Sequence, residues 1–132
     1  MFGVFVKRAN SQRTHLRQDF ERVTAELCRA DASTQRQVGR GINLANTRFV
    51  DGFGSEARFR QARPSERRRH LRQLGIAEAK AAKETPHLAT GFALFRMWLE
   101  ALSGNDGALL DQLTKALVFF SEKADVRRQT RR

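Results

Sequence analysis

The sequence predicts an all-α fold: a single-domain bundle of about five helices in which most neighbours run antiparallel. Two observations predict it. Apolar residues recur every three or four positions along most of the 132 residues, which is the spacing of one face of an α-helix. Glycine, proline and helix-capping residues separate these segments. The chain is long enough to bury a core without a disulfide, and the single cysteine, Cys28, excludes a disulfide within it.

Each of the first two helices is defined by one apolar stripe. The stripe of residues 11–30 consists of Leu16, Phe20, Val23 and Leu27. We expect Cys28 on the apolar side of this helix as an inert buried residue, with a reactive thiol as the alternative. Asp31 and Ser33 then break the chain and can cap the next helix. The stripe of that second helix consists of Val38, Ile42, Ala45 and Phe49.

The third helical region is less regular than the first two. Residues 55–63 form a loop or a short helical turn. Pro64 followed by Ser65 predicts a helix start in which Ser65 is the N-cap. Residues 66–83 then form either one helix bent at Gly75 or two short helices.

The last two helices form the apolar core of the predicted bundle. Thr85 before Pro86 predicts the start of a helix over residues 86–103, and Asn105 is expected to cap the final helix. The inward-facing residues of the first of these helices are Leu88, Phe92, Phe95, Leu99 and Leu102. Those of the second are Leu109, Leu110, Leu113, Leu117 and Phe120.

Three apolar residues of these helices lie away from the main stripes. Val118 and Phe119, together with the side of the preceding helix that carries Trp98, predict an exposed apolar patch. Such a patch is a candidate surface for a homodimer or another partner. The alternative is that the first two helices cover it.

The two ends of the chain are expected to lie outside the bundle of residues 11–126. Residues 1–10 are apolar and then basic, and residues 127–132 form a basic tail expected to be disordered. No apolar stretch is long enough to cross a bilayer, and residues 1–6 are too short for a signal peptide. We therefore expect a cytoplasmic protein without stable membrane insertion, with weak interfacial contact through residues 1–6 as a further hypothesis.

Positive charge is concentrated in the first half and at the C-terminal end. Residues 1–72 carry sixteen Lys or Arg against seven acids, and residues 73–126 carry five against seven. The formal net charge is +11, and arginine outnumbers lysine twenty to five. A GC-rich genome explains abundant arginine but not the deficit of acids. The asymmetry therefore predicts an anionic partner, either nucleic acid or an acidic protein surface.

The densest group of cations lies between residues 58 and 72. It consists of Arg58, Arg60, Arg63, Arg67, Arg68, Arg69 and Arg72, relieved there only by Glu66. The planar guanidinium group donates two parallel hydrogen bonds to a phosphate or carboxylate, so these side chains are candidate anion ligands. Further candidates are Arg36 and Arg40 on the second helix and the tail residues Arg127, Arg128, Arg131 and Arg132. The alternative is a solvated basic face that Glu78 and Glu84 partly neutralise.

The sequence contains no recognisable catalytic or metal-binding motif. His15, His70 and His87 have no ligand partners at helical spacing, so each is expected to be a solvated or core-edge histidine. The G-x-G pairs at residues 39–41 and 52–54 are interpreted as helix and turn glycines rather than phosphate loops. Residues 74–76 resemble the turn of a helix-turn-helix motif, but the segment after them lacks its apolar anchors. No cofactor is expected.

These observations predict a small, non-enzymatic binding protein with a basic surface. Nucleic acid or another polyanion is the expected partner. The alternative is a protein–protein interaction module, such as an adaptor, inhibitor or small regulator, that uses the apolar patch or arginine–carboxylate contacts.

Overall fold

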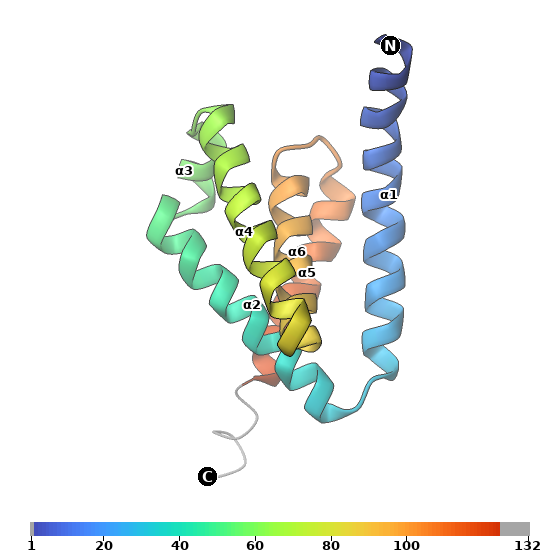
Figure 1. Ribbon diagram of the computed structural model, residues 1–132, viewed down its shortest axis with the longest axis vertical. Helices are drawn as coiled ribbons and strands as arrows, with labels where there is room; N and C mark the ends of the chain where they lie inside the picture. The colour runs from blue at the N-terminus through green and yellow to red at the C-terminus, as the bar shows by residue number, and fades with distance from the viewer. Residues whose placement is uncertain (1, 125–132) are drawn as a thin grey trace. The chain divides into compact units, whose positions relative to one another are not determined.

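The computed structural model describes the backbone of residues 2–124 and the side chains of residues 15–124 (Figure 1). The regular secondary structure of this part of the chain is all helical, which confirms the predicted all-α class. The six helices are α1 (Phe2–Arg29), α2 (Ala32–Phe53), α3 (Glu56–Gln61), α4 (Pro64–Glu84), α5 (Pro86–Leu102) and α6 (Gly107–Lys123). They divide into two compact units, α1 and the bundle α2–α6.

Helix α1 is longer than the sequence predicts. It begins at Phe2, so the predicted start at residue 11 is wrong. Residues 2–10 contain no proline and no helix-terminating glycine motif, and the helix therefore continues through them. Cys28 is exposed, which corrects the expectation of a buried thiol. It lies one position beyond Leu27, and this single step turns its side chain off the apolar stripe.

In the bundle, α2 packs along α5 and α6, and α4 packs along α5. The consecutive helices α4, α5 and α6 run antiparallel (Figure 1). Thr85 alone separates α4 from α5, because it ends one helix and precedes the other. The predicted stripes of the bundle form its core. Its buried members include Val38, Ile42, Ala45, Phe49, Phe92, Phe95, Leu99, Leu102, Leu109, Leu113, Leu117 and Phe120.

Glycines bring the backbones of α2 and α5 into close contact. A Cβ atom added at Gly91 would collide with the backbone oxygen of Val38, and one added at Gly41 would collide with that of Leu88. Gly39 lies in the same way against the backbone oxygen of Phe120 on α6. The interpretation of residues 39 and 41 as helix glycines is therefore correct. Their role in helix packing was not predicted, because it depends on which helix lies opposite.

The ends of several helices differ from the predicted ones. Helix α4 is one continuous helix through Gly75, so no turn of a helix-turn-helix exists there. Its N-cap is Arg63, and Ser65 lies within the first turn because Pro64 already occupies the first helical position. Asp106 rather than Asn105 caps α6, with a carboxylate oxygen that accepts a hydrogen bond from the Leu109 amide at 3.1 Å.

Candidate nucleic-acid interface

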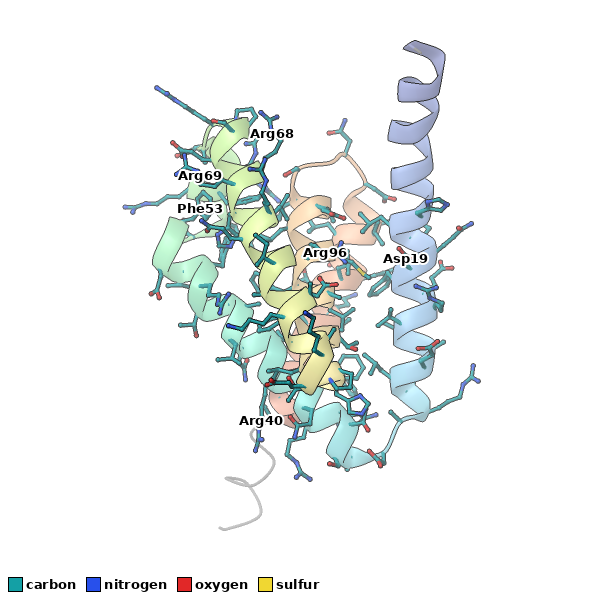
Figure 2. All side chains as sticks on the ribbon, in the orientation of Figure 1. Asp19, Arg40, Phe53, Arg68, Arg69 and Arg96 are labelled. Carbon is teal, nitrogen blue, oxygen red and sulfur yellow. The ribbon has the colours of Figure 1, made fainter. Side chains whose placement is uncertain are left out.

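Six exposed arginines lie on the short helix α3, the link after it and the first half of α4. They are Arg58, Arg60, Arg63, Arg68, Arg69 and Arg72, and we call them the basic corner. Arg68 and Arg69 mark its place at one end of the bundle in Figure 2. Within the described part of the chain, none of the six takes part in an ion pair. Their guanidinium groups are thus free to meet an external anion.

Arg67 differs from the other arginines of this segment. Its Nη1 donates hydrogen bonds to the carbonyl oxygens of Arg60 and Ala62, each at 2.9 Å, and its side chain is half-buried. These carbonyls belong to the end of α3 and the link after it, where helical partners are missing. Arg67 therefore ties α3 to α4. The sequence grouped it with the anion ligands, whereas its position gives it a structural role.

Buried aromatic rings hold the basic corner on the bundle. Phe59, the aromatic residue of α3, is fully buried. Its ring centroid lies 5.7 Å from that of Phe49 and 5.0 Å from that of Phe53, both on α2. Because the single aromatic residue of α3 is inserted among rings of α2, the arginines on either side of it point away from the core.

His70 lies at the edge of this aromatic cluster, as predicted for a core-edge histidine. Its ring centroid is 5.2 Å from that of Phe53, and its Nε2 is buried without a hydrogen-bond partner in the described residues. Burial, which disfavours the charged ring, together with the nearby positive charge of Arg48, lowers the pKa of His70 below its ordinary 6.5. His70 is therefore a neutral imidazole at pH 7.

An open depression of about 330 Å³ lies between α2 and α4 beside the basic corner. Its lining consists of Arg48, Asp51, Gly52, His70, Gln73 and Leu74. Arg48, Asp51 and Gln73 were not predicted from the sequence as residues of a site. Their helical spacing places Arg48 and Asp51 on one face of α2. Only the pairing of α2 with α4, however, brings that face opposite Gln73.

The structure does not bring Arg36 and Arg40 to this site. Arg40 lies at the other end of the bundle from Arg68 and Arg69 (Figure 2), and Arg36 lies one turn before it on α2. The four tail arginines, Arg127, Arg128, Arg131 and Arg132, lie outside the described residues.

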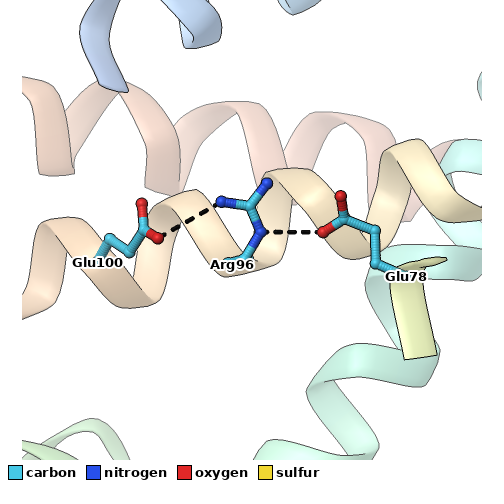
Figure 3. A network of polar contacts seen from close by, with 3 residues as sticks. All are labelled: Glu78, Arg96 and Glu100. Carbon is cyan, nitrogen blue, oxygen red and sulfur yellow. Dashed lines mark hydrogen bonds and ion pairs between the residues drawn. The ribbon is translucent and has the colours of Figure 1, made fainter. Parts of the chain in front are cut away.

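Glu78 does not neutralise the basic corner. It accepts a hydrogen bond from Nε of Arg96 at 2.9 Å, and Nη1 of the same guanidinium lies 3.4 Å from a carboxylate oxygen of Glu100 (Figure 3). Burial alone would lower the pKa of Arg96, but the hydrogen bonds and charges of the two glutamates raise it. This network joins α4 to α5. Of the two acids predicted to neutralise the basic face in part, it engages Glu78 with Arg96 instead.

The predicted apolar patch is smaller than expected. Trp98 is only 6% exposed, packs against Phe49 and Phe95, and donates from Nε1 to the hydroxyl of Thr114 at 3.0 Å. For Trp98 the exposed patch is therefore wrong and the alternative of cover by an earlier helix is correct, because Phe49 of α2 packs against its ring. Val118 and Phe119 on α6 are about half exposed, at 51% and 48%, and we call them the α6 apolar pair.

Other kinds of site find little support among the described residues. They contain no group of three or more side chains that could hold a metal ion. None of their helices combines the length and the apolar character needed to cross a membrane. Comparison with known proteins finds no family model, no curated protein and no solved structure that matches the chain. The inference of function therefore depends on the geometry alone.

Proposed function

We propose that this protein binds a polyanion, nucleic acid in the first place, through the basic corner, and that it is a binding protein rather than an enzyme. The observation that carries the proposal is the exposure of six arginines within fifteen residues, none of which pairs with an acid in the described structure. Residues 58–72 hold seven arginines and one glutamate, a net charge of +6. A rigid cluster of this charge is stable only when it is solvated or when it meets an anion.

The physical chemistry of arginine favours phosphate as the bound group. Each guanidinium group can donate two parallel hydrogen bonds to phosphate oxygens, and it keeps its charge at every physiological pH. Phe59 and Arg67 hold α3 in place, so the cluster loses little conformational freedom when it binds. A cytoplasmic location, where nucleic acid is abundant, is part of this proposal.

The proposal predicts a strong dependence of affinity on salt. Each neutralised phosphate releases condensed counterions. Six phosphate contacts therefore give a slope of about −5 when the logarithm of the binding constant for duplex DNA is plotted against the logarithm of the salt concentration. Replacing Arg68 and Arg72 with glutamine should reduce the slope by about 2, because two contacts are lost. Helix content should not change, since glutamine is nearly as good a helix former as arginine. Fluorescence anisotropy at a series of salt concentrations measures the slope.

Arg36 and Arg40 provide a matched control for this experiment. They lie on α2 with the same four-residue spacing, and their replacement by glutamine removes the same charge. We expect this second variant to keep the slope of the unmodified protein. If both variants reduce the slope equally, binding is not localised in the basic corner. Binding no tighter than about 10⁻⁴ M at physiological salt would contradict nucleic-acid binding altogether.

The α6 apolar pair supports a second candidate function, a protein-interaction module that forms a homodimer. Phe119 and Val118 are large, adjacent and half exposed, and Lys123 Nζ lies 4.7 Å from the Phe119 ring centroid. Under this hypothesis the unmodified protein sediments as a dimer, and Phe119→Glu converts it to a folded monomer. Val50→Glu is the control, because Val50 is also 48% exposed but lies on α2. A monomeric unmodified protein in sedimentation equilibrium would exclude the homodimer.

A further inference from the structure

The depression between α2 and α4 offers a mixture of polar and apolar surface. We propose that it binds an unpaired base of single-stranded nucleic acid while the adjacent arginines hold the phosphates of the same strand. This inference rests on the function proposed above and adds to it a preference for single strands. The depression has a volume of about 330 Å³, which lies at the lower end of the range of ligand pockets.

The chemistry of the lining fits a base better than a phosphate. Arg48 supplies hydrogen-bond donors, Asp51 supplies acceptors, and the Gln73 amide supplies both. The carboxylate of Asp51 would repel a phosphate, whereas the edges of a base present donors and acceptors together. Leu74 and the neutral ring of His70 add the apolar surface that the faces of a base require.

His70 forms a rigid part of the wall of the depression. Its Nδ1 lies 3.6 Å from the position of a Cβ atom added at Gly52, another residue of the lining. Phe49 and Phe53 pack against its ring at centroid distances of 6.2 and 5.2 Å, so the imidazole is held in place.

The basic corner continues directly into the depression. Arg69 lies one helical turn before Gln73 on α4, and Arg72 is adjacent to it; both arginines are exposed. A strand whose phosphates contact these arginines therefore carries its bases past the opening of the depression. A base in a duplex is stacked and paired and cannot enter without the cost of being extruded. Single strands should bind more tightly for this reason.

Gly52→Leu is the sharpest test, because it adds an apolar side chain to the lining of the depression at a position that accommodates a Cβ atom. A Cβ atom at residue 52 would meet the nearest atom, His70 Nδ1, at 3.6 Å, which is ordinary van der Waals contact. Leucine also favours the helix more than glycine does. Gly75→Leu on α4 is the matched control, since no atom lies within 4 Å of a Cβ added there. A labelled single-stranded oligonucleotide and a duplex of the same sequence are titrated by anisotropy at one salt concentration.

We expect the unmodified protein to bind the single strand about tenfold more tightly than the duplex, which is the contribution of roughly one stacked base. Gly52→Leu should remove this preference, leave duplex affinity unchanged and melt at the same temperature as the unmodified protein or higher. Gln73→Ala should weaken single-strand binding alone. The control should behave like the unmodified protein.

The outcomes separate the two proposals. If both oligonucleotides bind and Gly52→Leu retains the full preference for the single strand, the base pocket is wrong and the basic corner stands. Equal binding of the two oligonucleotides to the unmodified protein leads to the same conclusion. If neither oligonucleotide binds, both proposals are wrong.

Discussion

Replacing Phe49 with alanine should lower the free energy of unfolding by about 3–5 kcal/mol, the usual cost of removing a buried phenylalanine. Phe49 is 3% exposed, and its ring meets those of Phe59 on α3, His70 on α4 and Phe95 on α5. The cavity left by alanine would therefore open between four helices. Urea unfolding followed by circular dichroism measures the loss.

Phe119→Ala is the control for this measurement, because the same atoms are removed from a half-exposed position on α6. We expect it to cost less than about 1 kcal/mol. If the two variants are equally stable, the Phe49 side chain does not contribute to the core as its burial indicates. The Phe49 variant should also lose affinity for anions, because the ring that supports α3 is missing.

The second large effect is expected at Gly91, where α5 crosses α2. Gly91→Ala should destabilise the bundle by about 2 kcal/mol or more, although alanine favours an isolated helix over glycine by about 1 kcal/mol. The added Cβ would collide with the Val38 oxygen and would also lie 2.8 Å from the Cα of Gly41. Both are backbone atoms, so one whole helix must move to relieve the contact.

Gly75→Ala makes the same chemical change where the added methyl group meets no atom within 4 Å. It should stabilise the protein by about 0.5–1 kcal/mol through helix propensity and a less flexible unfolded chain. In thermal unfolding, we expect Gly91→Ala to lower the melting temperature and Gly75→Ala to raise it. A stabilising Gly91→Ala would show that α2 and α5 lie further apart than described here.

The sequence predicts the fold well because its core helices carry periodic apolar stripes. Leu99 and Leu113 lie where their spacing places them, fully buried. Prediction from the sequence fails where the burial of a residue depends on which other helix packs against it. Trp98 lies beside the stripe of α5, and its burial depends on Phe49 of α2 and Thr114 of α6, which only tertiary packing brings against it.

The candidate site follows the same rule. The density of arginine along residues 58–72 is visible in the sequence, and the structure exposes six of the seven. The different role of Arg67 could not be predicted, because its partners are backbone carbonyls whose positions depend on the turn between α3 and α4. The depression was missed because its lining comes from two helices that only tertiary packing brings together.

The single residue between α4 and α5 has a consequence for the order of folding. Closing so short a connection costs little chain entropy, so the antiparallel pair can form early from contacts local in sequence. Helix α2 must then dock across the pair through close glycine contacts, a step that tolerates little error in register. We therefore expect the docking of α2 to be the step that completes both walls of the depression and packs the aromatic rings beneath the arginines.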